Sequence, residues 1–279
     1  MTFAVYGLQA AAVRAADVAP GPTPQALLER GEVRSAWKLG RATLAGENAD
    51  ADVLVSMAKA ALAKAKTASL LSKKRWAVRG RDAYRAALAL NPDNADALLG
   101  LATFALRAPD GLGGGQETLA QLRAQLLDVS APHSLILAAR EAAKRDDAAA
   151  LDHYEVALLQ LTAGPYFSEY IKEAKSLGVQ QRAYDFVATQ SDLSPCTHFF
   201  AGRLASDLAL SEQAQLGHHI AFLETRTQFC ARSQVDKAVA LAAASLVPEG
   251  DTATEAFIQA RLAEIKAQSG DQKSRESSR

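Results

Sequence analysis

The chain has 279 residues, of which 49% are hydrophobic, so it is long enough for one or two ordinary domains or one elongated repeat array with a sizeable core. Aromatic residues make up only 6%, and much of the apolar content is Ala, which favours helices over strands, so we expect an all-α fold rather than a sandwich or barrel. The 31 basic side chains are balanced by 31 acidic ones, so the overall charge favours neither nucleic acid nor an anionic membrane, and no apolar run is long enough for stable membrane insertion.

The first 22 residues fit two interpretations. Residues 3–13 carry no charge, residues 13–15 match the small-x-small pattern of a signal-peptide cleavage site, and a turn-forming Pro-Gly-Pro follows at 20–22. Cleavage in this region would predict a periplasmic or secreted protein. The positively charged leader of a typical signal peptide is missing, so an ordinary leading helix with an apolar face is the alternative.

From residue 23 onward, apolar residues recur with helical periodicity, and Gly and Pro interrupt the pattern at intervals suited to single helices or helical hairpins. We expect regular hairpins over residues 23–163 and less regular ones over 164–269. Residues 270–279 are charged, rich in Ser and lack apolar anchors, so we expect a disordered tail there.

One segment has the spacing of small and aromatic residues that helical repeats share. Gly80, Tyr84 and Ala87 follow at intervals of four and three residues, and Pro92 comes five residues later. Residues 82–94 read DAYRAALALNPDN. This segment resembles the second helix and closing turn of a tetratricopeptide repeat (TPR), and about residues 24–162 look like the repeats of a bacterial TPR-like protein.

A second match lies 70 residues further on, at twice a period of 35, where Ala150, Tyr154 and Ala157 have the same spacing. The first helix of that repeat would carry the Leu-small pair Leu137 and Ala138.

One repeat should lie between the two matches. Its first helix would cover residues 95–107, with Leu101 and Ala102 as the Leu-small pair, and its second helix would cover about residues 116–127. The chain departs from the family pattern at Thr67 and Glu141 and by an insertion at 109–115.

The resemblance implies a right-handed superhelix of stacked antiparallel hairpins, a TPR-like α-solenoid. Each hairpin would bury one face against the next, with Tyr84 and Tyr154 filling the gaps between hairpins. It also implies a non-enzymatic scaffold whose partner is another protein or peptide segment.

A basic stretch is the first candidate for partner binding. Between residues 59 and 85 the only acid is Asp82, whereas four cations cluster at Lys73, Lys74, Arg75 and Arg79. They could line one side of a groove that attracts an acidic peptide or an anionic ligand. A solvated helix face is the more ordinary interpretation.

The two cysteines are candidates for a disulfide. Cys196 and Cys230 fall on two expected helices, 195–210 and 212–230, joined by a turn near Ser211. Both thiols would lie at the same end of this antiparallel pair, so a bridge fits the geometry and an exported protein. Two buried, reduced thiols are the alternative.

The sequence offers no catalytic set, cofactor or metal site that we would assign. The Gly-rich residues 109–115 are not followed by the Lys-Ser or Lys-Thr of a phosphate-binding loop, and no HExxH or CxxC motif occurs. The alternative function is a periplasmic helical protein that binds a small ligand or assists transport. Its pocket would need an enclosed cavity among Tyr166, Phe200 and Phe222, which at helical spacing are more often core residues.

Overall fold

A computed structural model describes residues 23–29, 32–44, 50–112, 114–161, 164–190, 195–224 and 233–277. Every regular element within these ranges is a helix, and none of these residues lies in a strand. The expected all-α fold is confirmed. Residues 1–22 lie outside the described ranges, and no helix of the described part is long and apolar enough to cross a membrane.

The helices follow one another with short connections. They are α1 (Pro24–Glu29), α2 (Val33–Leu44), α3 (Ala51–Thr67), α4 (Leu70–Leu90), α5 (Ala95–Arg107), the 3-10 turn η1 (Asp110–Leu112), α6 (Gln116–Val129), α7 (Ala131–Ala143), α8 (Ala149–Leu158), α9 (Gly164–Ser176), α10 (Gln180–Ala188), α11 (Pro195–Asp207), α12 (Glu212–Glu224), α13 (Ser233–Ala244) and α14 (Thr252–Ser277).

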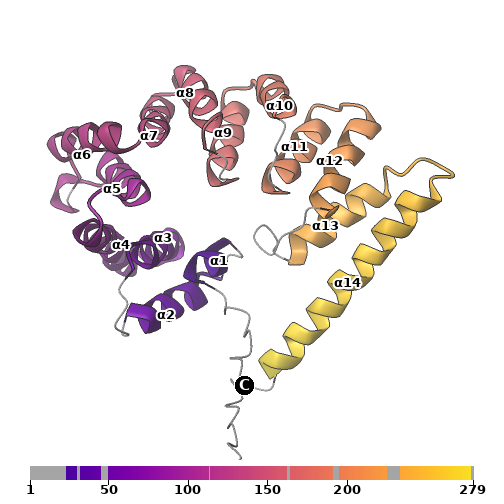
Figure 1. The fold of residues 1–279 in the computed structure, drawn as a ribbon, viewed down its shortest axis with the longest axis horizontal. Coiled ribbons are helices and arrows are strands. Elements are labelled where there is room, and N and C mark those ends of the chain that lie inside the picture. The colour runs from indigo at the N-terminus through magenta and orange to yellow at the C-terminus, as the bar shows by residue number, and fades with distance from the viewer. Residues whose placement is uncertain are drawn as a thin grey trace, which may run out of the picture.

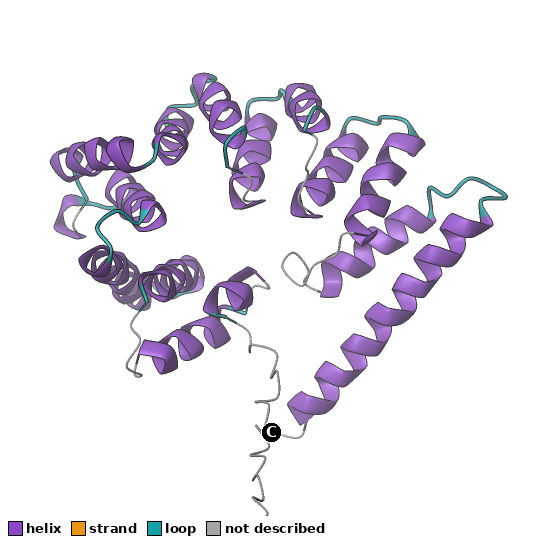
Figure 2. Ribbon diagram, viewed as in Figure 1, coloured by secondary structure: helices purple, strands orange, loops and turns teal. Residues whose placement is uncertain are grey.

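The helices are arranged in chain order along an open arc (Figures 1 and 2). Each packs on its neighbours in sequence, and several first helices of hairpins also pack on the next first helix, as α3 does on α5 and α5 on α7. In Figure 1, α3, α5 and α9 lie toward the inside of the arc, and α4, α6 and α8 lie toward the outside. This layout gives the chain an inner row and an outer row of helices.

The buried apolar residues form a main core and two smaller clusters. The main core runs from Leu54 on α3 to Leu204 on α11. A second cluster joins α12, α13 and α14 around Phe222 and Ile258, and a third joins α1, α2 and α3 around Ala36. Apolar burial therefore follows the arc and does not converge on one centre.

Small residues allow the helices of this core to approach closely. A Cβ on Gly80 would lie 2.8 Å from the Leu62 side chain, so the α3–α4 crossing has no room for a larger residue. A Cβ on Gly100 would lie 2.2 Å from the ring of Tyr84, so this tyrosine fills the gap between one hairpin and the next.

Two local expectations can be compared with the helix bounds. The predicted helix at 95–107 is α5, and the predicted helix at about 116–127 is α6, which continues to Val129. The insertion between them contains η1 and turns at Gly115, whose φ of 114° is readily adopted by glycine.

The expectation of a disordered tail is the clearest difference. Helix α14 continues through residues 270–277, most of the segment expected to be disordered. Its residues Ile258, Leu262 and Ile265 pack in the cluster with α12 and α13, and the helix then continues through residues such as Gln272, Lys273 and Glu276. Gln, Lys and Glu are good helix formers, and once a helix is nucleated each added residue gains one hydrogen bond, so the helix can continue through them.

Candidate functional site

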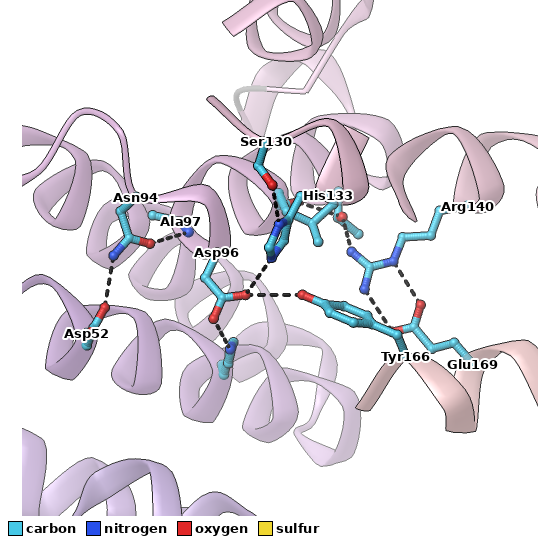
Figure 3. Close-up of polar contacts among 12 residues, drawn as sticks. Asp52, Asn94, Asp96, Ala97, Ser130, His133, Arg140, Tyr166 and Glu169 are labelled. Carbon is cyan, nitrogen blue, oxygen red and sulfur yellow. Dashed lines mark hydrogen bonds and ion pairs between the residues drawn. The ribbon is translucent and has the colours of Figure 1, made fainter. Parts of the chain in front are cut away.

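A polar network crosses the first helices of four successive hairpins, α3, α5, α7 and α9 (Figure 3). It begins at the start of α5, where Asn94 caps the helix by accepting a hydrogen bond from the Ala97 N–H (2.9 Å). The Asn94 amide also donates to Asp52 on α3 (2.9 Å), so the cap fixes α5 against the preceding hairpin.

Asp96, in the first turn of α5, joins three other helices. Its carboxylate accepts hydrogen bonds from the Lys59 ammonium on α3 and from the Tyr166 hydroxyl on α9, both at 3.1 Å. Burial raises the pKa of Asp96, but the charge of Lys59 and these hydrogen bonds outweigh burial and hold the pKa below its ordinary value. Asp96 is therefore ionised at neutral pH.

His133, in the first turns of α7, lies beside this carboxylate. Its Nδ1 is 2.8 Å from the Ser130 hydroxyl, and its Nε2 is 3.8 Å from Asp96. Burial lowers the pKa of His133, Asp96 partly offsets this effect, and nearby cations add to it, so the pKa lies below its ordinary value. The ring is therefore neutral at pH 7, and it meets the ring of Tyr166 edge to face at 6.0 Å.

Arg140, two turns after His133 on α7, holds α5, α7 and α9 together. Its guanidinium makes two hydrogen bonds of 2.8 Å to Glu169 on α9 and donates to Thr103 on α5 at 2.6 Å. Tyr154 on α8 also donates to Glu169 (3.1 Å). Burial raises the pKa of Glu169, but the hydrogen bonds and charge of Arg140 outweigh it, so the pKa lies below its ordinary value and the pair is ionised.

Ser130, His133 and Asp96 are the residue types of a serine-hydrolase triad, so their geometry must be compared with that chemistry. The His133–Asp96 distance of 3.8 Å is too long for a hydrogen bond, and Asp96 instead accepts from Lys59 and Tyr166. Ser130 lies three residues before His133 at the α6–α7 junction, where such a contact is a local helix-start interaction. The arrangement therefore suits helix-to-helix fixation better than nucleophilic catalysis.

The residues predicted to pack the repeats lie mostly in the core. Pro92 is exposed in its turn and Ala138 is half-buried. The buried ones are Gly80, Tyr84, Ala87, Leu101, Ala102, Leu137, Ala150, Tyr154 and Ala157.

The predicted partner-binding cations lie on α4, an outer helix, and not beside the polar network. Lys73, Lys74, Arg75 and Arg79 are all exposed. Arg79 is the one with a specific contact, because its guanidinium lies over the ring of Trp76 at 4.8 Å.

The predicted disulfide joins two cysteines whose side chains lie outside the described part of the structure. Cys230 lies outside the described residues, and of Cys196 only the backbone, at the start of α11, is described.

The aromatic residues considered as a ligand pocket are packed. Tyr166 is 8% exposed, Phe222 is 1% exposed, and Phe200 packs on the main core. Tyr166 and Phe222 also belong to different hydrophobic clusters.

Sequence reasoning missed the polar network, although one signal for it was present. His133 and Arg140 are seven residues apart and therefore share a helix face, as do Tyr166 and Glu169, which are three apart. Polar residues repeated on one face of otherwise apolar first helices can mark a surface that the hairpins share. Their partners, 29 to 70 residues away, followed only from the fold.

No protein-family model matches this chain, and a search of curated proteins found no match.

Proposed function

We propose that this protein is a non-enzymatic scaffold of TPR-like hairpins, stacked as a right-handed superhelix, that binds a segment of another protein along the inner row of helices. Two features support a solenoid of this kind. The helices pack in chain order along an arc, and Tyr84 packs on Gly100 of the following hairpin.

The observation that carries the binding proposal is that the polar network is only partly buried. The side chains of Lys59 and Asp96 are 36% and 42% exposed, and that of Glu169 is 36% exposed. These groups are held in fixed positions by their partners, so they can hydrogen-bond a docked segment at a small cost in side-chain entropy. The same network joins four hairpins, so the surface it presents is rigid.

Site-specific photo-crosslinking tests this proposal. A photoreactive amino acid at Lys59, on inner helix α3, should crosslink one defined partner segment in cells. The same amino acid at Leu127, exposed on outer helix α6, is the matched control. The binding proposal is rejected if Lys59 captures nothing, or if both positions capture the same set of proteins.

The proposed location is the periplasm or the cell exterior, since residues 13–22 have the features of a cleavage site. Mass spectrometry of the intact protein from cells is the test. A mature chain that starts near Ala16 would support export, and an intact N-terminus would reject cleavage.

A further inference from the structure

The outer face of the first two hairpins concentrates positive charge in a chain whose overall charge is zero. Helices α2 and α4 together carry nine cations and a single acid, Asp82. Asp82 is paired with its neighbour Arg81, whose guanidinium also donates to the Leu112 carbonyl. The remaining cations have no acidic partner among the described residues.

Both tryptophans of the chain lie within this face. Trp37 on α2 and Trp76 on α4 meet edge to face, with ring centroids 5.3 Å apart, and both are half-buried. A shallow depression beside them is lined by Trp37, Lys38 and Arg41. The guanidinium of Arg79 lies over the ring of Trp76, 4.8 Å from its centroid.

We infer that this tryptophan–cation face, formed by Trp37, Lys38, Arg41, Trp76 and Arg79, is a docking site for an acidic segment of a partner protein. It is separate from the inner surface of the proposed function, because it lies on the outer helices of the arc (Figure 1).

Charge complementarity is the first reason for this choice of ligand. Lys38, Arg41 and Arg79 are exposed and lack carboxylate partners within the described structure. Stacking on Trp76 restrains the Arg79 guanidinium and leaves its donors free for a carboxylate, which a planar guanidinium binds in a bidentate manner.

The geometry of the two tryptophans argues against two other anionic partners, a membrane surface and a nucleic acid. Trp37 and Trp76 are half-buried and pack on each other, so they do not protrude as the anchors of a membrane-binding surface do. One face of Trp76 is covered by Arg79 and is not open to a stacked nucleic-acid base.

The tryptophans also provide a local reporter, because intrinsic tryptophan fluorescence in this chain comes only from this face. We expect the unlabelled peptide (Glu-Glu-Leu)₄ to change the emission of the full-length protein saturably. Raising the salt concentration should weaken binding, because exposed charges are screened. The neutral peptide (Gln-Gln-Leu)₄ should have no effect.

A charge-reversal pair tests the location of the site. Arg41→Glu with Arg79→Glu should weaken peptide binding by about tenfold or more. The matched control, Arg145→Glu with Lys172→Glu, makes the same change in net charge at exposed positions of other hairpins and should change affinity by less than about threefold. If the reversed pair does not fold, as judged by circular dichroism, the neutral pair Arg41→Gln with Arg79→Gln replaces it.

Three results would overturn the inference. The first is no saturable response to the acidic peptide, and the second is equal weakening by the two reversed pairs. The third is tighter binding of phosphatidylserine vesicles or of a single-stranded oligonucleotide than of the peptide, which would assign the face to a membrane or to nucleic acid.

Discussion

Contacts between individual residues set the spacing of the hairpins. Tyr84 is 4% exposed and its ring covers Gly100 so closely that a Cβ there would come within 2.2 Å of it. Gly80 has the same role between α3 and α4, where Leu62 fills the space. Glycine inside a helix costs stability, so its presence at these crossings reflects a need for space.

Gly100→Ala should therefore destabilise the protein, although Ala is the better helix former. Displacing the Tyr84 ring should cost about 1–3 kcal/mol in the free energy of unfolding, measured by urea denaturation. The control is Gly217→Ala in α12, where a new Cβ would meet nothing within 4 Å. That change should stabilise the protein by about 1 kcal/mol. Equal effects of the two substitutions would contradict the packing described for Tyr84.

At the scale of whole helices, apolar burial is supplemented by a charged link between inner helices. Arg140 on α7 bonds Glu169 on α9 and Thr103 on α5, and its side chain is only 11% exposed. Most ion pairs of the described structure are more exposed, as Arg123–Glu141 between α6 and α7 shows, with Arg123 49% exposed. The Arg140–Glu169 pair should therefore contribute more to stability than the Arg123–Glu141 pair, although both join an arginine to a glutamate.

Removing Arg140 should cost more than removing Arg123. Arg140→Ala leaves Glu169 without its charge partner and should lower the free energy of unfolding by about 2–3 kcal/mol, discounted from a fully buried pair because Glu169 is partly exposed. Arg123→Ala should cost less than about 1 kcal/mol. Chemical denaturation of both variants measures the two losses in the free energy of unfolding. Similar losses would contradict a larger contribution from the Arg140–Glu169 pair between α7 and α9.

On the scale of the whole molecule, burial is divided along the arc. Leu98 on α5 belongs to the main core, and Ile258 on α14 belongs to the separate cluster of α12–α14. In an array whose units contact only their neighbours, stability is a sum of local terms, and parts of the chain can open separately.

Hydrogen exchange can detect this division. Ile258→Ala should remove about 2–5 kcal/mol of local packing and speed amide exchange in α12–α14, with little change in α3–α7. Leu98→Ala should do the reverse. If either substitution accelerates exchange evenly along the chain, the protein unfolds as one cooperative unit and the division is wrong.

A pH dependence of the whole fold follows from four histidines, of which His219 is buried and His133, His198 and His218 are half-buried. Burial lowers the pKa of His133, His198, His218 and His219. The charges of His198 and His219 lower the pKa of His218 further. Below the ordinary histidine pKa of about 6.5, the unfolded chain therefore binds more protons than the folded one, and lowering the pH favours unfolding.

The free energy of unfolding should therefore fall between pH 7.5 and 5.5, above the range in which the carboxylates titrate. Replacing both His198 and His218 with Gln should make the fall shallower, because these two rings, with Nδ1 atoms 3.5 Å apart, can no longer be protonated. Urea denaturation at the two pH values is the measurement. A stability that stays constant or rises on acidification would contradict the burial of these rings.

Parts of the fold could be predicted because they depend on local sequence. The bounds of α5 matched the expected residues, since Asn94 starts the helix after the Pro92 turn and the insertion at 109–115 follows its end. The tail was harder to predict, because low apolar content was taken as disorder whereas α14 extends through it. The Gly100 contact was missed because it depends on which ring lies opposite.

The sequence by itself determined the helical class, because the apolar residues recur with the period of a helix and Ala, which is abundant among them, is a poor strand residue. It also determined the bounds of α5 and the start of α6, since capping and breaking act within a few residues. Only the tertiary structure decided that Lys59, Asp96, His133 and Tyr166 meet, and that Trp37 and Trp76 share one face. These contacts join residues 33 to 70 positions apart, and such separations are set by how hairpins stack and not by any local pattern.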